Sequence, residues 1–313
     1  MYILIILLYY YNNIIDKLGW LFMEKKKTRK ISAEKLIKKK KIARHKRTKK
    51  IIEDIRKEID IDLDKVYVLN SDSIDNEQDY YCYTNTNVLK NELGIKDREH
   101  LIQVEKRVVM LKMYILREKM RNEFLEYDYS DDCKKIFKFK KDTLESILTV
   151  ERYMLIHKKM FDELYSFAGE FRTVNISKDT FVFAGHMFIQ EQAYNIFKEM
   201  NTEFIKLLVA NENILKRNKI NFKKKEINIK KKQLKQELAR LITKYLADLN
   251  VLHPFREGNG RATREVFREI AYIFGYLFTL KNIPTEEFMN AMKKSVYDNS
   301  TLNEIVYRSL YER

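Results

Sequence analysis

Apolar positions recur at three- and four-residue spacing through much of the second half of the chain, and this spacing predicts buried helices. One such helix precedes residue 250, a second follows residue 260, and a third lies near the C-terminus. Their apolar residues are Leu238, Leu241, Ile242, Tyr245, Leu246 and Leu249; Val266, Phe267, Ile270, Ala271 and Phe274; and Leu302, Ile305, Val306 and Leu310. Gly275 ends the second stripe, as glycine commonly ends a helix. Residues 253–264 are therefore expected to form a loop between two buried helices.

Residues 167–185 interrupt the helical spacing. A helical pattern ends near Tyr165, and the stretch that follows has β-branched and aromatic residues around Ser-Lys-Asp at 177–179. This pattern predicts two extended segments joined by a turn, and on its own it is also typical of a plain surface hairpin. Residues 80–116 are expected to be a loop that leads into a long helix.

The composition agrees with one mainly α domain. The chain has 313 residues, of which 45% are hydrophobic, with two Pro and seven Gly and no internal repeat. This is enough for a substantial core and leaves little room for a sandwich or barrel. We expect an orthogonal helical bundle with one β-hairpin over residues 51–313, and a segment outside the core at residues 1–50.

Positive charge is concentrated in two segments. The formal net charge of the chain is +16, while residues 24–50 alone carry +13 and residues 211–236 carry +8. Such lysine blocks suit RNA, DNA or an anionic membrane surface, but they lack interleaved aromatic residues, which favours solvated segments instead. The second block falls in a basic helical insertion at about 206–236.

The N-terminus and the cysteines bear on localisation. Residues 1–11 are apolar, but polar residues interrupt the stretch before the ~20 residues that a membrane span needs, so an anchor within residues 1–22 is less favoured than none. Met23 is an alternative start. Cys82 and Cys133 form neither a disulfide framework nor a metal-site spacing, which favours a reducing cytoplasm. His157 and His186 also have no ligand spacing and are expected to be structural.

The most informative residues are 253–264, His-Pro-Phe-Arg-Glu-Gly-Asn-Gly-Arg-Ala-Thr-Arg. They place a base, a carboxylate, a glycine turn and guanidinium groups at the start of a helix. Glycines let the backbone turn its N–H groups toward one point, and a helix N-terminus adds a positive dipole end. These are the parts that bind phosphate and deprotonate an acceptor, whereas a simple turn does not need them at these offsets.

This segment resembles the signature of the Fic family, His-Pro-Phe-x-(Asp/Glu)-Gly-Asn-Gly-Arg-x-x-Arg, at every specified position. The resemblance extends over residues 80 to about 205 and about 237 to 311. It implies a Fic-type orthogonal helical bundle with a β-hairpin flap, and transfer of AMP from ATP to a Ser, Thr or Tyr hydroxyl of a target protein, with release of pyrophosphate.

The resemblance also implies a role for each residue of the motif. His253 would be the general base, and Glu257 would hold Mg²⁺ at the phosphates. The other nucleotide-binding residues would be Gly258, Asn259, Gly260, Arg261 and Arg264. Pro254 and Phe255 would be structural, with Phe255 anchoring the loop in the core.

Residues 171–183 resemble the flap of this family, on which a target segment is thought to lie by strand addition. Lys178 and Asp179 match the hairpin tip, which in the family lies near the nucleotide. Doc-type relatives carry Lys where this chain has Gly260 and transfer a phosphoryl group instead, so Gly260 favours AMP transfer.

The inhibitory motif of many family members, (Ser/Thr)-x-x-x-Glu-(Gly/Asn), has no match in this chain. Ser73–Gln78 and Ser300–Ile305 each differ from it by one residue and are interpreted as coincidence. Any inhibitory glutamate would then come from a small antitoxin-like protein. Two alternatives to AMP transfer stay open: a catalytically silent Fic-fold adaptor that binds nucleic acid or membrane through its basic segments, and transfer of another nucleotide or of a phosphoryl group.

Overall fold

The computed structural model describes residues 80–128, 133–178, 181–211 and 224–313. The interpretations of the apolar N-terminus, the lysine-rich segment at 24–50, the domain boundary at residue 50 and Ser73–Gln78 fall outside these residues. So do Asp179 and residues 212–223 of the insertion.

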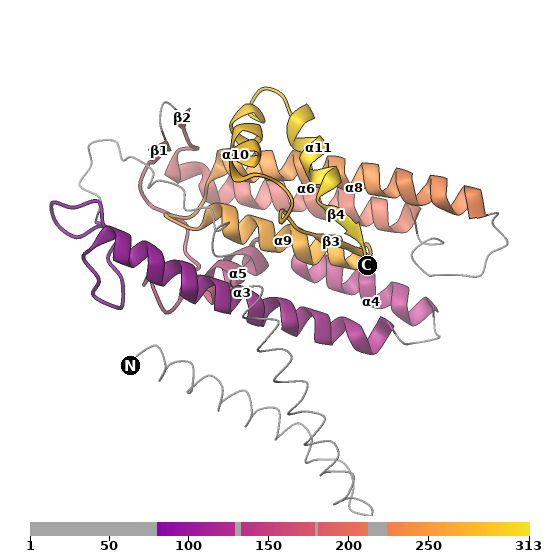
Figure 1. Ribbon diagram of the computed structural model, residues 1–313, viewed down its shortest axis with the longest axis horizontal. Helices are drawn as coiled ribbons and strands as arrows, with labels where there is room; N and C mark the ends of the chain where they lie inside the picture. The colour runs from indigo at the N-terminus through magenta and orange to yellow at the C-terminus, as the bar shows by residue number, and fades with distance from the viewer. Residues whose placement is uncertain (1–79, 129–132, 179–180, 212–223) are drawn as a thin grey trace, which may run out of the picture. The chain divides into compact units, whose positions relative to one another are not determined.

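The described residues are mainly helical (Figure 1). The helices are α3 (Arg98–Asp128), α4 (Cys133–Ile147), α5 (Val150–Phe161), α6 (Ile189–Ala210), α8 (Lys224–Leu252), α9 (Asn259–Ile273), α10 (Thr285–Lys294) and α11 (Ser300–Arg308), with a 3-10 turn η2 (His186–Phe188). The strands are β1 (Ser177–Lys178), β2 (Phe181–Val182), β3 (Tyr276–Phe278) and β4 (Leu310–Glu312). This confirms the predicted fold class.

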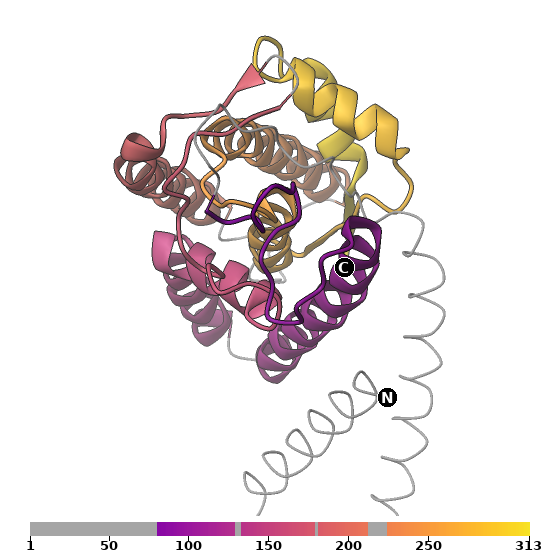
Figure 2. The ribbon, with the colours of Figure 1, turned by 90° about the vertical axis from the view of Figure 1, so that its left-hand side faces the viewer.

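Helix α9 lies at the centre and packs against α4, α5, α8 and β3 (Figures 1 and 2). Twelve of its fifteen residues are buried, including two carboxylates that its apolar stripe does not account for. Glu265 pairs with Arg117 of α3 at 2.8 Å, and Glu269 pairs with Arg152 of α5 at 2.6 Å. Because a buried carboxylate needs a partner, these pairs fix α9 against both helices.

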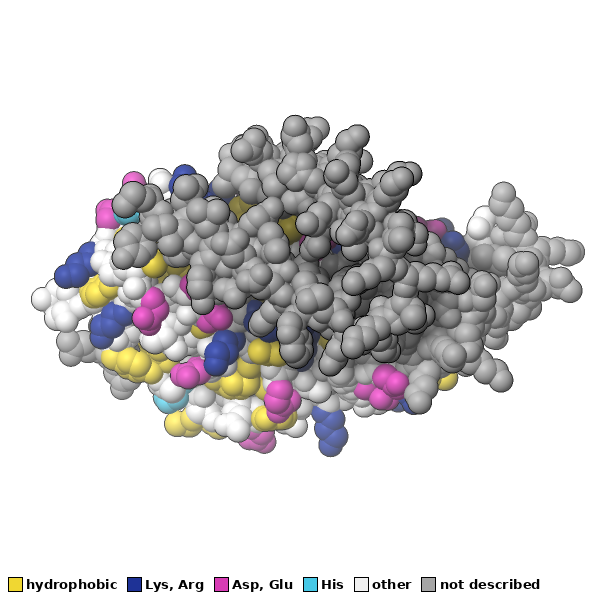
Figure 3. All heavy atoms as spheres, turned by 90° about the horizontal axis from the view of Figure 1, so that it is seen from below, with side chains coloured by type: hydrophobic (Ala, Val, Ile, Leu, Met, Phe, Trp, Pro, Cys, Tyr) yellow, Lys and Arg dark blue, Asp and Glu magenta, His cyan; other side chains and the backbone are white. Residues whose placement is uncertain are grey.

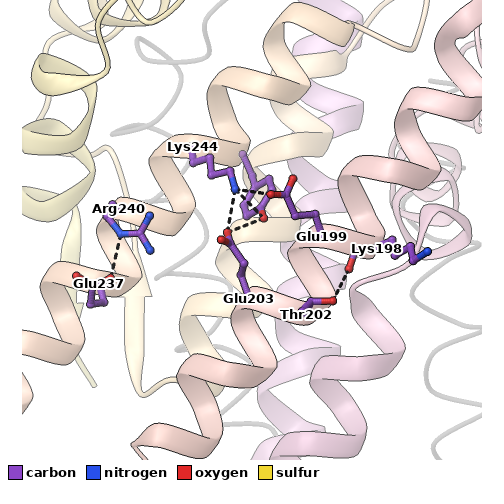
Figure 4. Close-up of polar contacts among 8 residues, drawn as sticks. Lys198, Glu199, Thr202, Glu203, Glu237, Arg240 and Lys244 are labelled. Carbon is purple, nitrogen blue, oxygen red and sulfur yellow. Dashed lines mark hydrogen bonds and ion pairs between the residues drawn. The ribbon is translucent and has the colours of Figure 1, made fainter.

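Helices α6 and α8 pack side by side through an apolar interface edged by polar contacts (Figure 4). Lys244 of α8 lies 2.8 Å from Glu199 and 3.1 Å from Glu203 of α6, and the hydroxyl of Tyr245 donates to Glu203 at 2.7 Å. Helix α8 begins at Lys224, so residues 224–236 of the basic segment are helical.

Two antiparallel two-stranded sheets are present among the described residues. In the first, Ser177 pairs with Val182 and Lys178 with Phe181, which makes the hairpin much shorter than the extended stretch that the sequence indicates. The second sheet, β3 with β4, is not predicted from the sequence. Leu310 was expected on the apolar face of the last helix, but it lies in β4 opposite Phe278. The side chain of Ser309 bonds back to the carbonyl of Ile305, where the helix ends.

The distribution of exposed charge is relevant to the nucleic-acid or membrane binding that was considered for the basic segments. On the face seen in Figure 3, the described Lys, Arg, Asp and Glu side chains are interspersed with hydrophobic ones. Among the described residues, no helix is long and apolar enough to cross a bilayer.

Candidate active site

The loop between α8 and α9 carries the motif, and its geometry is set by its own side chains. Asn259 closes the loop: its Oδ1 accepts from the N–H of Phe255 at 2.7 Å, and its Nδ2 donates to the carbonyl of Phe255 at 2.7 Å. Phe255 is fully buried, as expected for an anchor, and its ring packs against Tyr153 with centroids 4.9 Å apart. Since both ends of the Asn259 amide are engaged, its side chain shapes the motif loop.

Gly258 turns the chain into α9. Its φ of +82° lies in the left-handed region, and a Cβ there would lie 2.3 Å from Cζ of the buried Phe161. The first bond into the helix runs from the N–H of Ala262 to the carbonyl of Gly258 at 3.0 Å. The N–H groups of residues 259–261 thus have no acceptor one turn back within the helix, which is the arrangement that attracts phosphate.

His253 is oriented by a contact at one ring nitrogen. Its Nδ1 lies 3.2 Å from the carbonyl of Asn250, which can only accept, so Nδ1 is the donor in this contact. The ring stacks on Phe183 with centroids 3.9 Å apart and is buried. His253 also adopts a φ of +46°, an uncommon backbone conformation for a residue other than glycine. The contact at Nδ1 and the stacking on Phe183 therefore hold the imidazole in one orientation.

Arg172 joins the flap to the motif loop, a role that the sequence interpretation missed. Its buried guanidinium donates to the carbonyls of His253 at 2.8 Å, Val174 at 2.6 Å and Ala184 at 2.5 Å. Its backbone N–H donates to the carbonyl of Pro254 at 2.9 Å. The sequence contains an indication of this burial, because Arg172 and Val174 are two positions apart in a segment that is predicted to be extended and therefore lie on the same face.

His157 supports the loop from α5. Its Nδ1 accepts from the N–H of Gly169 at 2.9 Å, and its Nε2 donates to the carbonyl of Glu257 at 2.9 Å. Complete burial lowers the pKa of His157 to about 3, so the ring stays neutral. It also stacks on Phe255 at 3.8 Å. This agrees with the structural role expected for His157.

Arg261 lies between two carboxylates. Its Nη1 is 2.5 Å from Glu105 of α3, and its Nη2 is 3.1 Å from Oε1 of Glu257. The same Oε1 accepts from the N–H of Gly258 at 3.0 Å. The hydroxyl of Tyr165 donates to the other oxygen of Glu105. Glu105 was not identified from the sequence, although it lies in the partly buried stripe of α3.

Arg264 extends toward α10, where its guanidinium lies 6.0 Å from the ring centroid of Phe288. A Cβ at Gly260 would lie 3.1 Å from its Nη1, so any side chain at position 260 would contact this guanidinium. Glu304, the glutamate of Ser300–Ile305, is exposed on α11. This agrees with the interpretation of that near-match as coincidence.

The predicted flap residues are only partly described. Lys178 is half-buried in β1, opposite Phe181, while Asp179 lies outside the described residues. Phe181 packs edge-on against Phe183, which in turn stacks on His253. The hairpin and the motif loop are therefore connected by an aromatic contact as well as by Arg172.

Comparison with known proteins gives the following matches. A model of the Fic/DOC family matches residues 147–271. Protein adenylyltransferase VbhT of Bartonella schoenbuchensis is 28% identical over 235 residues, which is 75% of this chain and 39% of VbhT. A probable protein adenylyltransferase Fic of Salmonella typhimurium is 21% identical over 77% of this chain and 97% of its own length. The match to VbhT thus spans well under half of that relative.

Solved structures share the fold. BepC of Bartonella tribocorum, solved with bound AMPPNP, has a TM-score of 0.50 and 17% identity, over 74% of this chain and 97% of the other. An N-terminal Fic domain from Bartonella quintana, solved with bound ADP, has the same score and identity over 74% and 95%. At this identity the likeness describes the fold alone.

Proposed function

We propose that the protein, whose residues 147–271 match a model of the Fic/DOC family, is an adenylyltransferase that transfers AMP from ATP to a hydroxyl side chain of a target protein. In this reaction the hydroxyl oxygen forms a bond to the α-phosphorus. The bond from the α-phosphorus to the bridging oxygen breaks, and pyrophosphate leaves. The relatives named protein adenylyltransferases support this assignment.

The main support for the proposal is the contact between Nδ1 of His253 and the carbonyl of Asn250. With Nδ1–H bonded to the carbonyl of Asn250, Nε2 is the atom that takes the proton from the acceptor hydroxyl. The ring is fixed by Phe183 and by the hold of Arg172 on the His253 carbonyl. Positioning of this kind keeps the base in place without reorganisation during the reaction.

The phosphates would bind at the first turn of α9. The N–H groups of residues 259–261 and the guanidinium groups of Arg261 and Arg264 supply the donors. Gly260 places no side chain beside the guanidinium of Arg264, whereas the Cβ of a lysine at this position would lie 3.1 Å from its Nη1. This supports AMP transfer over phosphoryl transfer.

Glu257 is suited to hold the magnesium ion that accompanies ATP. Its side chain is 20% exposed at the end of the motif loop, and one carboxylate suffices because Mg²⁺ keeps several waters and binds substrate phosphates as well. When bound, the ion neutralises charge on the leaving pyrophosphate.

The target protein would lie along the β1–β2 hairpin within residues 171–183, with Lys178 and Asp179 at the tip near the nucleotide. Val182, which is 62% exposed on β2, is available to such a segment. A separate antitoxin-like protein that supplies a glutamate to Arg264 would restrain the enzyme. The role of the basic segments in binding nucleic acid or membrane is not needed for this function.

Two measurements test the proposal. Wild type is expected to label proteins of a cell lysate from ATP labelled at the α-phosphate, and to bind Mg-ATP more tightly than Arg264→Ala or Glu257→Ala. A catalytically silent adaptor would give no label and equal binding in all three proteins.

A further inference from the structure

The guanidinium of Arg261 is shared by carboxylates from two parts of the chain. Glu105, on α3, contacts Nη1 at 2.5 Å, while Glu257, in the motif loop, contacts Nη2 at 3.1 Å. The ring centroid of Phe161 lies 4.8 Å from the guanidinium carbon. Arg261 is 8% exposed, so this group of charges is largely removed from water.

The two carboxylates are not equivalent. Glu105 is anchored at both oxygens, by Arg261 on one side and by the hydroxyl of Tyr165 on the other. Its side chain is 13% exposed, against 20% for Glu257. Glu257 contacts Arg261 at the longer distance and lies on the loop that the substrate must approach. Oε1 of Glu257 also accepts from the N–H of Gly258 at 3.0 Å, so Glu257 keeps a partner in its own loop when Arg261 is held by Glu105.

Charge decides which partner Glu257 takes. One guanidinium and one carboxylate would form a neutral pair, and a cation from solvent would then have to displace Arg261 from Glu257. With Glu105 present, these three groups carry one positive and two negative charges, so the two carboxylates together outweigh Arg261 by one negative charge. Burial of Arg261 strengthens each of these interactions relative to water.

We propose that Glu105 is a positioning residue that holds Arg261 through its own carboxylate and thereby leaves Glu257 available to a divalent cation. The inference rests on the proposed function only in assigning that cation to Glu257. Tyr165 contributes by fixing the second oxygen of Glu105. The geometry thus extends the cation site from the motif loop to α3, which lies more than a hundred residues earlier in the sequence.

The test is Mn²⁺ binding at saturating AMPPNP, measured by electron paramagnetic resonance of the free ion. Glu105→Gln keeps the size of the side chain but removes its charge, and it is expected to raise the Mn²⁺ concentration at half-saturation on the order of tenfold. Tyr165→Phe keeps the charge but loosens Glu105, and a rise of about two- to threefold is expected. Glu257→Gln is expected to weaken Mn²⁺ binding at least as much as Glu105→Gln.

Glu269→Gln is the matched control, because Glu269 is a buried carboxylate of α9 paired with Arg152 and does not contact Arg261. The Mn²⁺ affinity of Glu269→Gln should equal that of wild type, although its melting temperature should be lower than that of wild type. Unchanged affinity in both Glu105→Gln and Tyr165→Phe, with a loss in Glu257→Gln, would overturn the inference and leave the proposed function intact. If the variants show the expected Mn²⁺ affinities but wild type transfers no AMP, the role of Glu105 is supported and the proposed function is refuted.

Discussion

Gly258→Ala tests the geometry at the start of α9. Gly258 has a φ of +82°, and an added Cβ would lie 2.3 Å from Cζ and 2.4 Å from Cε2 of Phe161. A left-handed conformation costs an alanine about 1–2 kcal/mol. Phe161 is fully buried, so its ring has little room to move, and overpacking in a core adds about 1–3 kcal/mol. The expected loss in the free energy of unfolding is therefore about 2–5 kcal/mol.

The chain offers a matched control in Gly275, which ends α9. Its φ is +86°, but nothing lies within 4 Å of a Cβ placed there. Gly275→Ala should lose only the conformational cost of about 1–2 kcal/mol. At ~2–4 °C for each kcal/mol in a domain of this size, thermal melting separates the two variants. Equal melting temperatures for Gly258→Ala and Gly275→Ala would refute the contact with Phe161 as the reason for glycine at 258.

Two further predictions concern residues that contact the motif loop. A lysine at position 172 cannot donate to several carbonyls at once, so Arg172→Lys should lose at least about 2 kcal/mol of stability. It should also lower kcat for AMP transfer more than it changes the KM for ATP, and an unchanged kcat would contradict the positioning of His253 by Arg172. His157 has its pKa lowered to about 3 by burial, so the unfolded chain takes up a proton below its ordinary value of 6.5 while the folded protein does not. Stability should therefore fall as pH drops from 6.5 toward 3, by up to on the order of 5 kcal/mol, and His157→Gln should remove this dependence from denaturant unfolding measured across that range; an equal pH slope in both proteins would contradict it.

The predictable parts of the fold are those governed by local pattern. The stripe from Val266 to Phe274 and the glycine after it define α9, whose observed bounds are Asn259–Ile273. The motif loop was predicted only in part, because it ends at Gly258 and residues 259–264 already belong to α9. Local spacing carries this information, since helix and turn formation depend on neighbouring residues.

The missed features depend on partners far away in the sequence. Leu310 fits a helical stripe, yet it pairs with Phe278 in a sheet, because strand pairing is decided by a segment that local spacing does not reveal. Glu105 contacts a motif arginine 156 positions later, and nothing in its neighbourhood identifies that partner. Arg172 alternates with Val174 in the sequence, which indicates that both side chains lie on the buried face. The hydrogen-bond acceptors of Arg172 could not be predicted, because they are backbone carbonyl groups, which every residue has.

The central claim is that His253 drives transfer of AMP, and transfer of label from ATP tests it most directly. ATP labelled at the α-phosphate and ATP labelled at the γ-phosphate are compared with wild type, His253→Ala and the surface control His100→Ala. Label from the α-position alone, present in wild type and His100→Ala and absent in His253→Ala, is the predicted result. Label from the γ-position, or α-label that persists in His253→Ala, would contradict the account.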